Sequence, residues 1–356
     1  NKMSKKTASD QVLSCALWAF CLLILFYVAC FISSLHLQKY IYAFRMVVTG
    51  SDRSSSGAVA MVKRFIASAF LWPCIILLPL VLTHNDLYKR VFPSQWYDAQ
   101  AEDYWHRSDK VWPSPLGLSL GLLAVSVGQV CTLIYFILWK SGSLGLEHLA
   151  VQKTGAPAYV LWEGLVDHLS QPEGFLMLGG YLTGTWMLGL MPSSYYSFSG
   201  GINVFHVAMQ LLITDFIQYV MHKLEHDVSP KFYQISHKPH HRFTNPKLFD
   251  AFNGSPTDTF CMILIPLAIT ARLVPANVWS YMAFGSLYAN WLTLIHSEYK
   301  HPWDDVFRAV GFGTAADHHV HHKLFIYNFG HLFMYWDKLL NTYKDPKNVR
   351  EFNKDV

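Results

Sequence analysis

Long runs without a charged residue constrain the fold of this chain more than any other feature. Three runs contain no Asp, Glu, Lys or Arg, and they cover residues 12–32, 116–139 and 278–295. Three others are shorter or almost uncharged, and they cover residues 65–82, 175–191 and 202–221. Because a spanning helix needs about 20 apolar residues, we predict an all-α, polytopic membrane protein with about six to seven membrane segments.

The composition agrees with a membrane protein. Hydrophobic residues make up 52% of the chain and charged residues only 15%, whereas soluble domains carry about 25% charged residues. The run at 12–32 is too long for a signal-peptide core and lacks a clear cleavage site, which favours a retained helix. The net charge of +4 comes without a basic block, so nucleic acid is not an expected partner. The six cysteines form no CxxC motif and predict neither disulfides nor thiolate ligands.

Histidines are concentrated in the last third of the chain. Between residues 222 and 331 lie 12 of the 18, most of them in four tight clusters. The clusters are His222 with His226; His237 with His240 and His241; His296 with His301; and His318, His319, His321 and His322. Since neutral imidazole is the commonest protein metal ligand and one ion takes about four to six ligands, the clusters predict a centre for two ions.

The order of apolar and polar segments brings the four clusters to one membrane face. A helix from residue 202 to about 226 delivers the first cluster, and a largely apolar hairpin at 258–295, turning at 272–275, returns the chain to the same side. The first arm of this hairpin, near 258–271, is short for a full span. Of the 14 Lys and Arg residues from position 222 onward, only Arg272 lies away from the histidines, so the positive-inside rule predicts a cytosol-facing cap.

The remaining organisation is less regular. Residues 145–170 have a mixed pattern that favours an amphipathic helix at the membrane surface. The Ser, Tyr and Gly-rich stretch at 192–201 indicates a boundary between N-terminal membrane helices and connectors at 1–197 and a di-metal domain at 198–356.

The spacing of the clusters suggests how ligands divide between two ions. The pattern HxxHH occurs twice, at 237–241 and 318–322, and adjacent histidines on a helix cannot point the same way. Each doublet therefore gives one imidazole to each ion, while His222 and His226 share one helix face. The predicted ligands are His222, His226, His237, His240, His241, His296, His318, His321 and His322. Further candidates, as ligands or as residues that support ligands, are His301, His319 and His331.

Asp215 is an acidic residue within an otherwise apolar helix. It shares a helix face with Gln218, His222 and His226, and an intramembrane carboxylate is costly without a partner. We expect Asp215 to support a ligand histidine or to face the reaction cavity; a purely structural bond to a neighbouring helix is the alternative.

At these clusters the chain resembles the fatty acid hydroxylase/sterol desaturase superfamily of membrane di-iron enzymes, across roughly residues 200–345. The segment His296-Ser-Glu-Tyr-Lys-His-Pro-Trp-Asp304 is similar to the HSGYxxPW segment of cholesterol 25-hydroxylases and to the related segment of sphinganine C4-hydroxylases. Residues 321–330 and 336–343 resemble the family's HH…NYG…WD ending, which sterol C5-desaturases share. Two positions depart from the pattern: several relatives have HxxxH where His296 and His301 are five apart, and Asn341 replaces the usual Gly.

The resemblance implies an enzyme with two iron ions held in the cap over a four-helix membrane base. Dioxygen would be the co-substrate, and electrons would come from cytochrome b5 or a similar carrier. The substrate would be a membrane lipid (a sterol, sphingoid base or fatty acyl chain), with hydroxylation favoured over desaturation, and the location would be the endoplasmic reticulum. Zinc binds histidine well and could replace iron in purified protein, but only a redox metal activates oxygen.

Three other readings stay open. A metal-ion transporter would place its ligands near the bilayer midplane, whereas these clusters follow the apolar segments. A bis-histidine haem protein would pair single histidines from separate helices. An inactive family member could serve as a structural subunit of an oligomer or larger membrane assembly. The complete ligand set argues against lost activity, but the N-terminal half, to which the resemblance does not extend, keeps this reading open.

Overall fold

The computed structural model describes residues 115–145, 148–158 and 177–356, together with the single residues 77, 81, 87 and 90. All of them fall within one compact unit, Ile75–Val356. The membrane segment expected at 12–32 and nearly all of that expected at 65–82 lie outside the described residues. The described part is helical, and its β contacts are isolated bridges.

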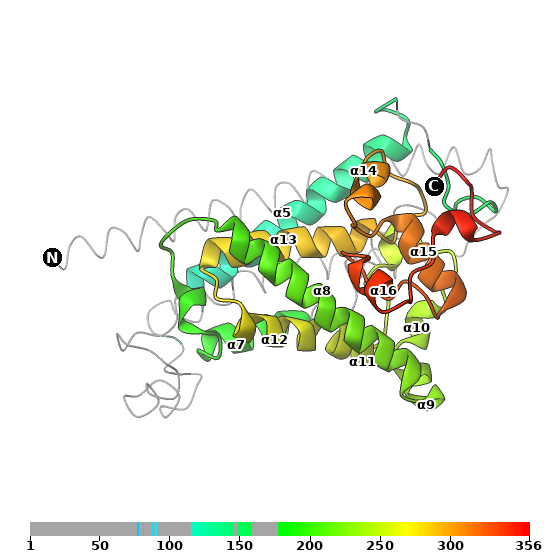
Figure 1. The fold of residues 1–356 in the computed structure, drawn as a ribbon. Coiled ribbons are helices and arrows are strands. Elements are labelled where there is room, and N and C mark those ends of the chain that lie inside the picture. Colours follow the sequence, from blue (N-terminus) through cyan, green and yellow to red (C-terminus); the bar gives the residue numbers. More distant parts are fainter. Residues whose placement is uncertain are drawn as a thin grey trace, which may run out of the picture. The chain divides into compact units, whose positions relative to one another are not determined.

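Long apolar helices form the body of the described part (Figure 1). They are α5 (Pro115–Lys140), α8 (Val204–Asp227), α13 (Val278–Leu294) and a continuous run made of α11 (Pro256–Thr259), the π-helical turn η6 (Phe260–Leu264) and α12 (Ile265–Leu273). Among the described residues, three helices are long and apolar enough to cross a membrane: Leu116–Lys140, Val204–Asp227 and Pro256–Leu273. The predicted all-α membrane class is confirmed; the total of six to seven segments stays a prediction.

The hairpin before the third histidine cluster has the expected turn. α12 ends at Leu273, and α13 begins after Asn277, whose side chain accepts the N–H of Ser280 at 2.9 Å. The first arm is longer than expected, because the side chain of Ser255 caps its start and Pro256 occupies the first helical position. The expectation that this arm is too short to span is therefore corrected: the run has 18 residues.

Close contact between α5 and α13 fixes one side of the body. A Cβ at Gly128 would lie 2.2 Å from Nδ2 of Asn290, so only glycine permits this approach. The amide of Asn290 accepts hydrogen bonds from Thr132 Oγ1 at 2.6 Å and from Gln129 Nε2 at 3.2 Å. Polar groups inside apolar helices thus satisfy one another across the interface.

Short helices gather at one end of the long ones and form the cap (Figure 1). They are α9 (Pro230–Ile235), α10 (Lys238–His241), α14 (Asp304–Ala309), α15 (Ala315–Leu324) and α16 (Tyr335–Leu339). Shorter 3-10 turns lie at η4 (Ser193–Tyr196), η5 (Leu248–Asp250) and η7 (Pro346–Asn348). Thr314 and Asp317 form a capping box at the start of α15, and Ala316 and Val320 pack against Phe352 near the C-terminus.

One expectation outside the histidine clusters needs correction. Residues 148–158, expected within an amphipathic helix at 145–170, form turns and bridges instead: Ala150 pairs with Tyr299 and Gln152 with Phe352. Val151 between them is fully buried, so this segment braces the cap rather than lying on a membrane surface. Within the membrane segment expected at 175–191, a π-helical turn at 177–179 leads directly into α7 (Gly180–Met187), and residues 175 and 176 lie outside the described residues, so this segment stays a prediction.

Candidate metal centre

The structure brings the nine predicted ligands together as two groups of imidazoles. In each group, one ring nitrogen per histidine lies within 4.8 Å of the corresponding nitrogens of the others. The first group, here called the α8 group, contains His222, His226, His237, His241 and His321. The second, the α13 group, contains His240, His296, His318 and His322. Eight of the nine are buried, and His226 is partly exposed.

Both HxxHH motifs are divided between the two groups. His241 lies in the α8 group and its neighbour His240 in the α13 group; likewise His321 and His322 belong to different groups. The first histidine of each motif joins the group of the last one: His237 lies with His241, and His318 lies with His322. Residues four apart lie one helical turn away from each other on the same face. Each group therefore combines ligands from three segments of the chain.

The distances between ring nitrogens fit a shared ion. In the α8 group, Nε2 of His237 is 2.8 Å from Nε2 of His222, and Nε2 of His241 is 2.9 Å from that of His321. In the α13 group, Nε2 of His296 is 3.2 Å from that of His240 and 3.0 Å from that of His318. Nitrogens about 2.1 Å from one ion are expected to be roughly 3 Å apart, so the donor set fits two ions.

The outer nitrogens of the rings are held by acceptors. Nδ1 of His222 faces the carbonyl of Phe329 at 2.8 Å, Nδ1 of His321 that of Tyr327 at 2.8 Å, and Nδ1 of His296 that of Leu292 at 2.7 Å. A ring that donates from Nδ1 keeps its lone pair on Nε2, where the neighbouring Nε2 atoms converge. The backbone thus sets both the tautomer and the direction of these ligands.

Burial keeps the imidazoles outside the spanning helices neutral. It lowers the pKa of His240 to about 4 and that of His318 well below its usual range, and the charge of neighbouring imidazoles acts in the same direction on His318. The pKa of His296 and of His322 is also lowered well below its ordinary value, first by burial. A metal ligand must be the neutral ring, so these imidazoles are in the form that can bind a metal at neutral pH.

Two carboxylates beside His237 were not singled out from the sequence. Oδ1 of Asp258 lies 2.6 Å from Nδ1 of His237, which orients that ring as a carboxylate–histidine pair does. Glu225 is fully buried and its Oε2 is 3.6 Å from the same nitrogen. The sequence signals were present: Glu225 lies between His222 and His226, and Asp258 opens the apolar run of the hairpin.

Asp215 has backbone partners rather than a ligand imidazole. Its carboxylate accepts the N–H groups of His331 at 3.3 Å, Leu332 at 2.7 Å and Phe333 at 3.0 Å, and Nε1 of Trp336 at 3.1 Å. It therefore fixes the loop that follows Gly330.

The three remaining candidates lie in different surroundings, and none belongs to either group. His301 stacks on Trp303 with ring centroids 5.0 Å apart, and its Nδ1 is 2.9 Å from the hydroxyl of Tyr135. His319 faces away toward Phe352, with ring centroids 6.5 Å apart. The ring of His331 lies between the two groups, 5.0 Å from the rings of both His222 and His318.

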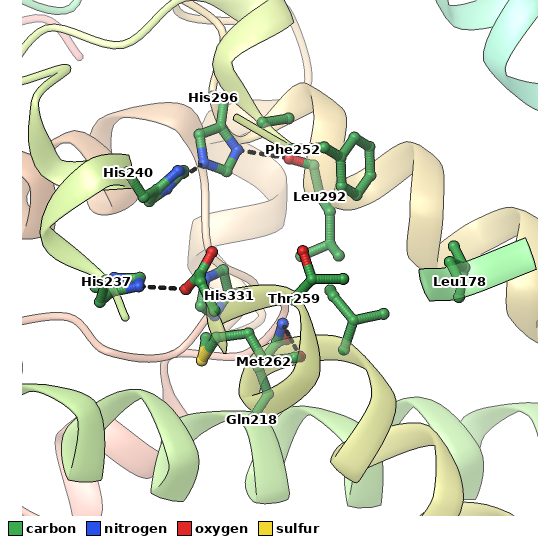
Figure 2. Close-up of a pocket in the computed structure, with 13 residues that line it drawn as sticks. Leu178, Gln218, His237, His240, Phe252, Thr259, Met262, Leu292, His296 and His331 are labelled. Atoms are coloured by element: carbon green, nitrogen blue, oxygen red, sulfur yellow. Dashed lines mark hydrogen bonds and ion pairs between the residues drawn. The ribbon is translucent and has the colours of Figure 1, made fainter. Parts of the chain in front are cut away.

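A cavity joins the histidines to an apolar region (Figure 2). His237, His240 and His296 lie at one end of the view, with His331 between them and Thr259, and Leu178 lies at the opposite end. The apolar part of the wall includes Phe252, Met262, Ile263 and Leu292. An apolar molecule in this cavity would place a carbon atom beside the metal ligands.

One wall of the cavity is shaped by the π-helical turn η6. A π-turn inserts one residue and leaves backbone groups without their regular partners, and such turns often occur at functional sites. Here the carbonyl of Met262 accepts Nε2 of Gln218 at 3.0 Å, and both residues line the cavity.

Comparisons with known proteins agree on one group of enzymes. The profile of the fatty acid hydroxylase family matches residues 207–342. A Phaeodactylum tricornutum protein named "Alternative squalene epoxidase" is 54% identical over 318 residues, which cover 87% of this chain and 90% of that protein. The "Probable Delta(7)-sterol 5(6)-desaturase" of Neurospora crassa is 29% identical over 155 residues, covering 44% of this chain and 41% of that enzyme. The "Delta(7)-sterol 5(6)-desaturase" of Eremothecium gossypii is 31% identical over 136 residues, 38% and 36% of the two chains. No solved structure matches.

Proposed function

Because the chain belongs to the fatty acid hydroxylase/sterol desaturase superfamily and is a membrane lipid oxidoreductase, we propose that it epoxidises squalene with two iron ions and dioxygen. In this reaction one oxygen atom adds across a carbon–carbon double bond. The other oxygen atom takes up two electrons and two protons and leaves as water. The sequence predicted hydroxylation or desaturation. These reactions would use the same kind of metal-based oxidant, but on a C–H bond instead of a double bond.

The likeness to the Phaeodactylum protein is the observation that carries this proposal. It extends over 318 residues, far beyond the family match at 207–342, and so includes much of the N-terminal half. The Neurospora desaturase shares only 155 residues with the chain. The chain thus shares segments outside the histidine domain with the protein named as a squalene epoxidase. The shorter match to the desaturase does not extend this far. This difference favours squalene as the substrate of this chain.

The cavity supports a substrate that lacks a polar anchor. Of the charged residues, its lining contains Asp258, which is already bonded to His237. The described lining has no Lys or Arg that would hold a fatty acid carboxylate. The cavity has a volume of about 70 Å³, so it would receive only a short segment of squalene, a pure hydrocarbon, against the apolar wall formed by Phe252, Ile263 and Leu292.

The chain's own residues would hold the metals and exclude water. When bound, the two iron ions would supply the redox chemistry that activates dioxygen. The carbonyls of Phe329, Tyr327 and Leu292 keep three ligand rings in one tautomer, and Asp258 does the same for His237. The buried position of both groups would keep bulk water away from the reacting atoms.

Charge and family membership support a proposal for the location and for the electron supply. The Lys and Arg residues around the histidine clusters support a cytosolic cap, which we place at the endoplasmic reticulum. From there a soluble domain of cytochrome b5 or a similar carrier could reach the centre.

Expression in yeast cells that lack their own squalene epoxidase tests the proposal. We expect the protein to restore growth without added sterol and to convert isotopically labelled squalene to its epoxide, with one oxygen atom from labelled dioxygen. The His240→Ala variant is the matched negative control. Accumulation of squalene together with a new hydroxylated or desaturated sterol would instead identify a sterol oxidase, which the desaturase matches make the second candidate.

A further inference from the structure

His331 occupies the gap between the two histidine groups. Its ring centroid is 5.0 Å from His222 of the α8 group and 5.0 Å from His318 of the α13 group. It is only 5% exposed, yet it belongs to neither group. It also lines the cavity, where Figure 2 shows it between His237 and Thr259. His331 thus lines the cavity and lies beside both histidine groups. Its ring nitrogens do not belong to the set of nitrogens that defines either group.

The backbone of His331 is fixed on both sides. Its N–H is donated to Asp215 at 3.3 Å, and its carbonyl accepts Nε1 of Trp291 at 3.4 Å. The preceding residue, Gly330, donates its N–H to Asp337 at 2.8 Å, and a Cβ there would lie 2.5 Å from the carbonyl oxygen of Phe333. These contacts therefore hold the backbone at His331 in place beside the cavity.

The side chain of His331 itself has a free hydrogen-bonding atom. Nδ1 is buried and has no partner among the described residues. Nδ1 of His241, His318 and His322 is also buried without a partner among the described residues, whereas Nδ1 of His222, His296 and His321 each face a backbone carbonyl. Of these four unpartnered Nδ1 atoms, that of His331 belongs to a residue that lines the cavity, and the other three do not. A buried polar nitrogen without a partner is costly, so its presence beside a cavity points to a bound molecule that completes its bonding.

We propose that His331 is a positioning residue that hydrogen-bonds a small exogenous ligand held between the two metal ions. The ligand would be a water molecule, dioxygen or a small anion such as azide, because imidazoles bound the gap on both sides and leave room only for a small molecule. The inference rests on the two-ion centre of the proposed function and is independent of squalene as the substrate.

Azide titration of the iron-loaded, detergent-solubilised full chain tests the inference. Azide bound to ferric iron gives a visible charge-transfer band, so its Kd is read without any turnover. We expect His331→Phe to keep two irons per chain and to raise the azide Kd at least tenfold, equivalent to about 1.4 kcal/mol. His331→Gln keeps an N–H donor and is expected to recover most of the affinity. His301→Gln, a buried histidine outside the cavity, is the control with unchanged Kd.

Three results would overturn the inference. One is an unchanged azide Kd in His331→Phe, or in His331→Ala if the larger side chain prevents folding. Another is loss of one iron in His331→Gln, which would make His331 a ligand. A wild-type chain that holds fewer than two ions would remove the gap itself. A wild-type chain that binds azide in a His331-dependent way but forms no epoxide would refute only the proposed substrate.

Discussion

Oδ1 of Asp215 accepts the backbone N–H of Leu332 at 2.7 Å, although 117 residues separate them. Asp215 lies on the apolar helix α8, two turns before His222, and Leu332 directly follows His331 in the cap. This bond therefore connects the helix that supplies the first ligand to the loop that lines the cavity. Because Asp215 is fully buried, loss of this bond would leave a buried polar group without its partner.

Asp215→Asn should destabilise the protein and lower its activity. The amide replaces one acceptor oxygen by a donor, so at least one of the N–H groups of Leu332, Phe333 and Trp336 would face another N–H. Leaving such buried groups without partners costs about 1–3 kcal/mol in stability, and displaced supporting groups typically cost roughly 10–100-fold in activity. Thermal unfolding and turnover of Asp215→Asn and Asp215→Glu measure this, and we expect the Glu variant to be far milder. Thr214→Val, which loses one neutral bond to Thr270, is the control; equal effects would contradict the prediction.

His240→Ala and His321→Ala should each abolish oxidation while the protein stays in the membrane. His240 belongs to the α13 group and His321 to the α8 group, so each variant weakens a different metal site. Metal analysis should fall from two ions per chain toward one in both variants. His319→Gln, which alters a histidine outside both groups, should keep two ions. Full activity in either alanine variant would contradict the ligand assignment.

The metal-free protein should lose stability as the pH falls. Burial lowers the pKa of His240 in the folded protein to about 4, below the unfolded value of 6.5. The unfolded chain therefore takes up a proton first, and stability present above pH 6.5 is lost as the pH falls toward 4; His240 alone contributes about 3 kcal/mol. Melting temperatures of chelator-treated protein between pH 7 and 4 test this, with metal-loaded protein as the reference. A flat profile in the chelated sample would show that the buried imidazoles accept protons without unfolding.

Gln218→Leu should lower turnover by more than its loss of stability would explain. It removes the donor to the Met262 carbonyl in η6 and leaves that carbonyl buried without its partner, at a cost of about 1–3 kcal/mol. Gln210→Leu is a matched control on the same helix: it loses a bond to the Tyr195 hydroxyl but does not line the cavity. We expect comparable unfolding temperatures in the two variants and reduced turnover only in Gln218→Leu. Equal turnover would mean that η6 has no part in substrate placement.

Much of the fold and of the centre could be predicted because local patterns determine them. Runs of apolar residues produced α5, α8 and the hairpin, and the spacing of the two HxxHH motifs led to two groups, since the offset between neighbours on a helix is set by geometry. The clusters could be assigned to one place because a hairpin returns the chain to the side it left.

Other features depended on contacts between distant segments. Nothing near Asp215 in the sequence indicates that its partners are the backbone groups of residues 331–333, because any backbone amide can serve as a donor. His301 has the spacing of a ligand, but Tyr135 and Trp303, one of them 166 residues away, surround it with aromatic rings. The segment at 148–158 reads as half-apolar, yet bridges to Tyr299 and Phe352 keep it out of a helix.

The division of each histidine doublet would link the loading of two metal ions. Residues 237–241 and α15 both contribute nitrogens to the α8 group and to the α13 group, so an ion bound in one group orders the backbone that forms the other. The second ion would then meet ligands whose conformational entropy has already been lost, and we expect it to bind more tightly than the first. Metal uptake should therefore be cooperative, and chains with a single ion should be scarce even when metal is limiting.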